Sequence, residues 1–385
     1  MQSIVGRRPL VLSRTIWRRF DLVHFFIVLL LVAIGEVMIY SAYETSLPAD
    51  VPLLERAVFR QSIFALVGFA LYLTAAAIDY RALGSLAPWI YGVVVLLLAI
   101  TLTLGRTAFG AQSWLDTEAP FDVQPSELAK VLMILVLARY LGDDPEALES
   151  PKPLLLSILL ILPPAVLIYV QPDFGTALIL LAIWAGMVFL SGVRWRHLFL
   201  LALVGAIAAP AVWFQMEDYM RQRIVLFFFP EGDPSGASYN VMQALISIGS
   251  GGWLGKGLLR GTQSQLHFLR VRHTDFIFSV LAEEMGFVGA ILLLTLFAVL
   301  ILRLARIAMT TPDTYGRLLV AGVASMILVQ TVINVGMNAN LLPVTGLPLP
   351  LVSYGGSSLV TTLLALGLTQ GVAMRSKPAD ESLLP

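Results

Sequence analysis

Hydrophobic runs long enough to span a membrane recur along the whole chain. A bilayer core of about 30 Å requires about 20 apolar residues in a helix. Windows of this kind lie near residues 22–43, 57–78, 87–105, 124–142, 154–171, 174–191, 197–214, 276–302, 316–338 and 351–373. The pattern predicts an all-α, polytopic integral membrane protein with about ten transmembrane helices. We expect residues 1–385 to form a single integral-membrane domain.

One connection between predicted spans is much longer than the others. Residues 215–275 separate the seventh and eighth spans, and connections of this length are usually functional or disordered. Residues 239–259 within this segment are apolar and include the glycine cluster "SIGSGGWLGKG". We therefore predict an ordered external loop, part of which lies on the membrane surface.

Basic residues predict the orientation of the chain. The arm formed by residues 1–20 carries Arg7, Arg8, Arg14, Arg18 and Arg19, and most other lysines and arginines near span ends fall on the same side of the predicted topology. The positive-inside rule then places both termini, including the tail 376–385, in the cytoplasm. The predicted location is the cytoplasmic (inner) membrane, with the long loop outside. The first apolar run lacks a small-residue cleavage site and is interpreted as an anchor.

Composition supports the membrane assignment and excludes several functions. Hydrophobic residues make up 58% of the chain and charged residues 13%, whereas soluble domains are about 25% charged. The mean hydropathy is +0.83. A formal net charge of +0 provides no overall basic field for nucleic acid. The absence of cysteine excludes disulfides, thiolate metal sites and cysteine nucleophiles.

Two titratable residues lie in the predicted fourth span. An ionisable side chain within a membrane helix costs about 2.5–3.5 kcal/mol on insertion scales, so it requires a partner or a function. In "QPSELAK", Glu127 and Lys130 are three residues apart and share one helical face. Two interpretations remain open. The pair either only neutralises itself and pins the helix, or it also organises a polar cavity.

The densest titratable cluster precedes the predicted eighth span. The segment "RVRHTDFIFSVLAEE" contains, in order, Arg270, Arg272, His273, Thr274, Asp275, Ser279 and Glu283. The simplest interpretation is that Thr274 or Asp275 caps the helix. However, Asp275, Ser279 and Glu283 recur every four residues and therefore form one stripe. The stripe predicts a polar cleft that enters the membrane from outside, with Asp275 at its rim and phosphate-binding arginines beside it.

Two further external motifs supply polar or aromatic groups. In "GAQSWLD", Trp114 is either an interfacial anchor or a stacking platform for a sugar or lipid. In "GLPLPLVSYGGSS", prolines and glycines break the entry to the last span, and Ser353 and Tyr354 are expected to line a cavity with Asn334 and Asn338. The external clustering of these groups points to chemistry on a lipid-linked, phosphorylated, polar headgroup.

Taken together, the motifs resemble those of a known family. "QPSELAK", "QPDFGTALIL", "SGGWLGKG", "GTQSQL", "HTDFIFSVLAEEMG" and "GLPLPLVSYGGSS" occur in the order found in the SEDS proteins (shape, elongation, division and sporulation), and their wording is more similar to the RodA branch than to the FtsW branch. Members commonly carry a proline and an acid before the His-Thr-Asp motif, where this chain has Arg270, Val271 and Arg272.

The resemblance implies the SEDS fold and peptidoglycan glycosyltransferase activity during cell elongation, in which lipid II is polymerised into glycan strands. It also implies that Asp275 is the residue essential for polymerisation, that Glu127 and Lys130 form the family's intramembrane pair, and that Trp114 is its loop tryptophan. The implied partners are a class B penicillin-binding protein, which is a transpeptidase, and the elongation machinery.

Our hypothesis is an inverting transfer in which Asp275 is the general base and undecaprenyl pyrophosphate leaves. The candidates for binding the pyrophosphate are Arg221, Arg223, Arg270, Arg272 and Lys130, and a divalent cation (Mg²⁺ or Mn²⁺) is a further candidate. The alternatives are a lipid II flippase and a scaffold that only activates its partner. The external position of the polar groups favours the enzyme.

Overall fold

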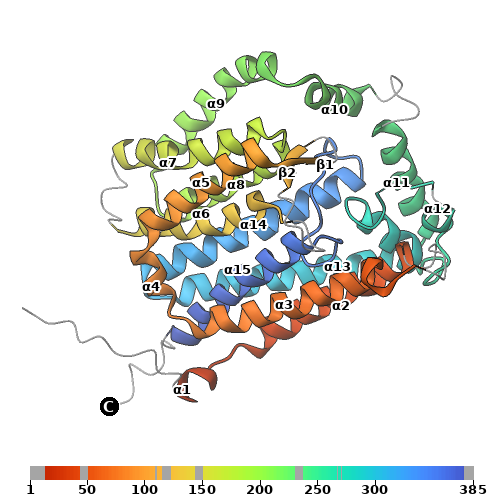
Figure 1. The fold of residues 1–385 in the computed structure, drawn as a ribbon, viewed down its shortest axis with the longest axis horizontal. Coiled ribbons are helices and arrows are strands. Elements are labelled where there is room, and N and C mark those ends of the chain that lie inside the picture. The colour runs from red at the N-terminus through yellow and green to blue at the C-terminus, as the bar shows by residue number, and fades with distance from the viewer. Residues whose placement is uncertain are drawn as a thin grey trace, which may run out of the picture.

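The helical architecture expected from the hydrophobic pattern is present. The structure, a computed structural model, describes residues 14–43, 51–108, 111–114, 123–143, 151–229, 237–266, 268–269 and 271–376. Most of the long helices of this described part run side by side, whereas α9 extends away from the others (Figure 1). They are α2 (Leu22–Ala42), α3 (Ala57–Ala77), α5 (Ala87–Leu104), α6 (Pro125–Gly142), α7 (Pro151–Val170), α8 (Phe174–Leu190), α9 (Trp195–Gln215), α13 (Ile277–Thr310), α14 (Thr314–Asn338) and α15 (Gly356–Arg375). The predicted all-α, polytopic fold class is confirmed.

Shorter elements connect the long helices. They are α1 (Arg14–Trp17), η2 (Leu53–Glu55), α4 (Tyr80–Ser85), α10 (Asp218–Phe228), α11 (Ala237–Gly251), α12 (Thr262–Gln265), and the antiparallel strands β1 (Arg106–Ala108) and β2 (Ala111–Trp114). The hairpin was not predicted from the sequence. In Figure 1, α10, α11 and α12 lie together at one end of the bundle, and α1 and α4 lie at the other.

Length and composition identify most of the long helices as membrane spans. Within the described residues, seven helices are long and apolar enough to cross a bilayer, and α8 and the first part of α9 are shorter apolar helices. The remaining long helix, α6, carries Glu127, Lys130 and Arg139, which lower its hydropathy. The chain is therefore a multi-pass membrane protein.

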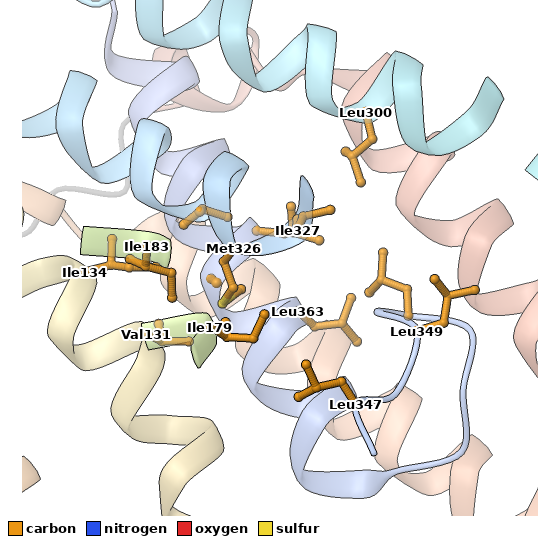
Figure 2. Close-up of a cluster of buried hydrophobic side chains, with 14 of the residues drawn as sticks. Val131, Ile134, Ile179, Ile183, Leu300, Met326, Ile327, Leu347, Leu349 and Leu363 are labelled. Carbon is orange, nitrogen blue, oxygen red and sulfur yellow. The ribbon is translucent and has the colours of Figure 1, made fainter. Parts of the chain in front are cut away.

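The interior position of α6 explains how it can carry charges. It contacts α5, α7, α8, α14 and α15, and most of its side chains are buried. Val131 and Ile134 of α6 face Ile183 of α8 and Met326 of α14 in the core (Figure 2). Because neighbouring helices surround α6, its Glu127 and Lys130 side chains face protein partners instead of lipid.

The helix α13 is interrupted by a glycine turn from the segment between α9 and α13. Gly286 has φ 65° and ψ −164°, a conformation that breaks the helix. Backbone groups freed by the break pair with residues 252–257: Phe287 donates to Gly252 (2.9 Å), and Gly257 donates to Glu284 (3.0 Å). Gly255 has φ 78° and packs against the backbone of Gly286. The irregular backbone is thus satisfied by protein, as the membrane requires.

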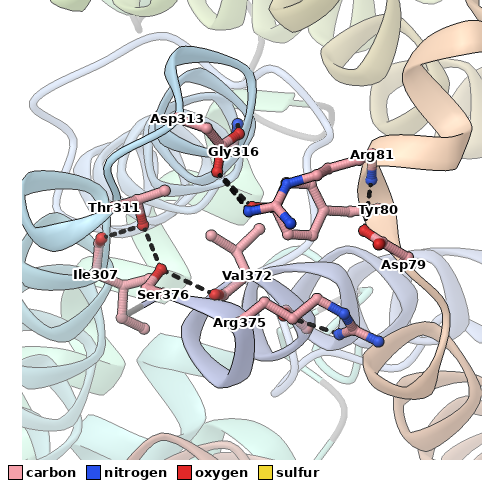
Figure 3. Close-up of polar contacts among 11 residues, drawn as sticks. Asp79, Tyr80, Arg81, Ile307, Thr311, Asp313, Gly316, Val372, Arg375 and Ser376 are labelled. Atoms are coloured by element: carbon pink, nitrogen blue, oxygen red, sulfur yellow. Dashed lines mark hydrogen bonds and ion pairs between the residues drawn. The ribbon is translucent and has the colours of Figure 1, made fainter. Parts of the chain in front are cut away.

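The opposite end of the bundle is tied together by polar contacts. Tyr80 of α4 donates to Asp313, which caps α14 (2.5 Å). Arg375, at the end of α15, donates to the carbonyls of Ala76 and Ala77, which end α3. Figure 3 shows Tyr80, Asp313 and Arg375 at this end of the bundle, in separate groups of polar contacts. We call this end, which carries α1, α4 and the end of α15, the basic end.

Candidate functional site

The backbone of Asp275 is held at the entrance to α13 by two buried amides of α14. The carbonyl of Asp275 accepts hydrogen bonds from Asn334 Nδ2 (3.0 Å) and Asn338 Nδ2 (2.9 Å). These asparagines are four residues apart and therefore share one helical face. Ser279 donates its hydroxyl hydrogen to Asn338 Oδ1 (2.6 Å). The amides fix the position of Asp275 without using its carboxylate.

The carboxylate of Asp275 lies beside the guanidinium of Arg223, which projects from α10. A methyl group placed on Gly346 would lie 3.8 Å from Asp275 Oδ2 and 3.6 Å from Arg223 Nη1. Arg223 also donates to the carbonyl of Val344 (3.5 Å). Burial raises the pKa of Asp275 to about 6, while Arg223 and a hydrogen bond from Thr274 act in the opposite direction. A carboxylate with a pKa near 6 is ionised at neutral pH and is still basic enough to accept a proton.

A small cavity of about 60 Å³ lies next to Arg223. Its walls come from α10, from α11 and from residues 340–344, and they include Leu226, Phe227, Met242 and Leu245. The site therefore has a small apolar recess beside Arg223.

The segment before α15 holds the backbone of His273 and Thr274, the two residues that precede Asp275. Ser353 donates to the carbonyl of Thr274 (2.5 Å), and the Tyr354 N–H donates to the carbonyl of His273 (2.9 Å). The His273 ring lies between Tyr43 and Tyr354, with ring centroids 4.6 and 5.5 Å away. Burial, followed by the charge of Arg272, lowers the pKa of His273 to about 4. His273 is therefore neutral at pH 7 and adds no charge for a phosphate.

The two carboxylates deeper in α13 have protein partners. Glu283 Oε1 accepts from Lys256 Nζ (2.7 Å), Thr262 Oγ1 (3.0 Å) and the Gln263 N–H (3.1 Å). Glu284 accepts from the Ser41 hydroxyl (2.6 Å). Ser279 and Glu283 are fully buried. The stripe of Asp275, Ser279 and Glu283 thus joins α13 to α14 and to residues 256–263.

A second buried cluster links three motifs that are distant in the sequence. Lys130 Nζ lies 2.8 Å from Glu127 Oε1, and both side chains are almost fully buried. Ser126 donates to Asp173 (3.2 Å), which also caps α8. Burial raises the pKa of Asp173. The Gln124 N–H donates to the hydroxyl of Ser357 (3.0 Å), in the first turn of α15. The start of α15 therefore contacts this cluster, and the segment just before it contacts the cluster at Asp275.

Several predicted site residues lie away from Asp275. Arg272 donates to the carbonyl of Ala42 at the end of α2. Arg221 donates to the carbonyls of Trp213 (3.1 Å) and Phe214 (2.8 Å) at the end of α9. Trp114 is half-buried at the end of β2. Arg270, most of the N-terminal arm and nearly all of the tail lie outside the described residues.

The sequence analysis did not single out Lys256, Gly346 or Gln61. Lys256 neutralises Glu283, and Gln61 of α3 contacts the backbone of Ser353 (3.3 Å) and Gly355 (3.3 Å). The only sequence signal was an isolated lysine in a glycine cluster and an isolated glutamine at the start of an apolar run. Neither residue has a near neighbour in the sequence that reveals its partner.

A family model matches this arrangement over nearly the whole chain. The model of the cell cycle proteins FtsW, RodA and SpoVE matches residues 21–378. The chain belongs to this family. One relative of this chain is the peptidoglycan glycosyltransferase MrdB of Escherichia coli strain K12, which is 38% identical over 376 residues. The match covers 96% of this chain and 98% of the relative.

Solved structures of family members have the same fold. One is a chain from a study of how a peptidoglycan synthase complex coordinates polymerization and crosslinking, with a TM-score of 0.77 and 37% identity, covering 92% of this chain and 97% of that one. Another is the rod shape determining protein RodA of Thermus thermophilus, with a TM-score of 0.69 and 36% identity, covering 94% and 99%. The predicted family is confirmed.

Proposed function

We propose that this protein is a peptidoglycan glycosyltransferase that polymerises lipid II during cell elongation. The observation that carries the proposal is the Asp275 carboxylate beside Arg223 at the entrance to α13. The family relatives named as peptidoglycan glycosyltransferases support the reaction class.

In the proposed reaction, the 4-hydroxyl of one sugar attacks the anomeric carbon of another, and undecaprenyl pyrophosphate leaves. The new glycosidic bond forms as the bond to the pyrophosphate oxygen breaks, with inversion at the anomeric carbon. Asp275 removes the hydroxyl proton. The leaving group departs as an anion that requires positive charge nearby.

Arg223 is the candidate best placed to bind a substrate pyrophosphate. Its guanidinium and the Asp275 carboxylate both lie within 4 Å of the Cβ position of Gly346. In contrast, Arg221 and Arg272 donate to backbone carbonyls at helix ends, and Lys130 pairs with Glu127. Guanidinium groups bind phosphate oxygens through paired hydrogen bonds. Arg223 therefore serves both to bind phosphate and to keep Asp275 ionised.

No group of three His, Asp or Glu side chains suited to a metal ion is found in the described part of the chain. Asp275 instead has an arginine as its charged neighbour. We therefore assign no step of the reaction to Mg²⁺ or Mn²⁺.

The proposed partner is a class B penicillin-binding protein that crosslinks the new strand within the elongation machinery. A solved neighbour from a complex that coordinates polymerization and crosslinking supports this pairing. We also propose that the protein lies in the cytoplasmic membrane with the basic end inside. Arg81 of α4 and Arg375 at the end of α15 lie at the basic end. They support this orientation, because cytoplasmic segments of membrane proteins are enriched in arginine and lysine.

The decisive experiment is a polymerisation assay with purified protein, its partner and lipid II. We expect Asp275→Asn to lower the rate by about 10²- to 10⁴-fold, because a general base contributes about that much. The Arg221→Gln variant is the matched control, since Arg221 lies on α10 but donates to α9. Elution as a single folded species must be unchanged in both variants. A wild-type rate in Asp275→Asn would disprove the assignment of the base.

A further inference from the structure

An acidic side chain lies inside the membrane-spanning helix α2, where the proposed reaction has no role for it. Glu36 is six residues before the end of α2, which corresponds to about 9 Å along the helix axis. Val37 and Tyr40, which lie closer to that end, are large hydrophobic side chains and are 46% and 47% exposed. Glu36 is therefore within the apolar part of the span, where an ionisable residue requires a partner or a function.

Glu36 makes its contact with the neighbouring helix, α3. The helices α2 and α3 pack against each other (Figure 1). Ser62 Oγ, on the sixth residue of α3, lies 3.2 Å from Glu36 Oε2. The same Oγ lies 2.9 Å from the carbonyl oxygen of Val58. The Ser62 hydroxyl therefore has two oxygen neighbours.

A proton on Glu36 completes both hydrogen bonds of Ser62. A serine hydroxyl has one hydrogen to donate and two lone pairs with which it accepts. The carbonyl of Val58 can only accept, so the shorter contact uses the Ser62 hydrogen. The contact with Glu36 Oε2 then requires a hydrogen from the acid. A protonated Glu36 supplies it, whereas a carboxylate has none to donate.

The second oxygen of Glu36 also indicates a neutral acid. Glu36 Oε1 is buried, and no group in the described part of the chain donates a hydrogen bond to it. The ion pairs among the described residues do not include Glu36, whereas Glu127 and Glu283 lie 2.8 and 2.7 Å from lysine amines. A buried carboxylate without a cation or a donor is costly. The carbonyl oxygen of a neutral acid carries no such charge.

The residues beside Glu36 and Ser62 are packed closely under the segment before α15. A Cβ on Gly35 would lie 2.6 Å from the carbonyl oxygen of Val352. Gln61 contacts the backbone of Ser353 (3.3 Å) and Gly355 (3.3 Å). The protein side of the contact between α2 and α3 is thus formed by close-packed backbone, which supplies no charge to balance a carboxylate.

We propose that Glu36 is a proton-binding site within the membrane and, because it keeps its proton at neutral pH, a site of modification by hydrophobic carbodiimides. These reagents enter apolar phases and react with carboxylic acids that carry a proton. The acid proton moves to one carbodiimide nitrogen, and the carboxyl oxygen bonds to the central carbon. The O-acylisourea rearranges to a stable N-acylurea, so the side chain gains the mass of one reagent molecule and nothing leaves.

The test is peptide mass mapping of the full chain after treatment with dicyclohexylcarbodiimide in detergent at pH 7. We expect the adduct on Glu36, and we expect Glu127 and Glu283 to stay unmodified because each faces a lysine. The Glu36→Gln variant should lose this adduct. A cationic, water-soluble carbodiimide is the matched control reagent, which should modify the exposed Asp218 and spare Glu36. An unmodified Glu36, or equal modification of Glu36 and Glu283, would refute the proposal.

The thermal midpoint of the same variant tests the charge of Glu36 without the reagent. We expect Glu36→Gln to keep the midpoint of the wild type in detergent at pH 7, because the amide N–H donates to Ser62 in place of the acid hydrogen. A higher midpoint would mean that the substitution had removed a buried charge. A lower midpoint would mean that a carboxylate had made a contact that an amide cannot replace. Either change would overturn the assignment of a neutral acid.

Discussion

At the residue scale, Asp275 and Arg223 are electrically coupled. Burial raises the pKa of Asp275, and the positive charge of Arg223 partly offsets that rise. A general base acts in its ionised form, so the rate should fall as the pH drops through about 6. The two side chains are near enough to interact because both lie within 4 Å of the Cβ position of Gly346.

Replacing Arg223 tests the coupling. We expect Arg223→Gln to move the acidic limb of the profile of log kcat/KM against pH to higher pH, because the cation that lowers the pKa of Asp275 is lost. The measurement is lipid II polymerisation across pH 5–8, with Arg221→Gln as the control. An acidic limb that stays near pH 6 in Arg223→Gln would contradict the pairing.

At the element scale, the helix boundaries followed from the sequence more readily than the internal geometry of α13. The windows near 276–302 and 316–338 correspond to α13 and α14, because hydrophobic length is a local property of the chain. The break at Gly286 was not predicted. It depends on the turn at residues 252–257, which is distant in the sequence and pairs with the interrupted backbone.

The break in α13 requires a glycine at position 286. A Cβ on Gly286 would lie 2.3 Å from the Gly255 nitrogen, and its φ of 65° disfavours any other residue. We expect Gly286→Ala to reduce the free energy of unfolding by about 1–3 kcal/mol, measured as a lower thermal midpoint in detergent. Gly92→Ala in α5 is the control, since no described atom beyond its own stretch of helix backbone lies within 4 Å of the added methyl group. A thermal midpoint for Gly286→Ala equal to that of Gly92→Ala would argue against the break.

At the scale of the whole molecule, orientation in the membrane is the property to test. The chain has no cysteine, so single cysteines can be labelled without background. We expect Asp218→Cys on α10 to react with a membrane-impermeant maleimide in intact cells. Arg194→Cys, in the connection between α8 and α9, should react only after permeabilisation. Both positions are exposed. The reverse pattern would invert the proposed topology.

The sequence by itself determined the family, the all-helical class and the approximate position of each long helix. These properties follow from hydrophobic runs and contiguous motifs, which need no knowledge of distant contacts. It also identified Asp275 as the candidate base, through a motif in one short segment.

Only the tertiary structure decided which cation serves which carboxylate. Five basic residues were equal candidates for the pyrophosphate in the sequence, and the packing of α10 against residues 344–346 brought Arg223 to Asp275. Lys256 was brought to Glu283 by the glycine turn. Charges in a membrane protein are satisfied by whichever helix or loop lies beside them, and that neighbour is set by long-range packing instead of local spacing.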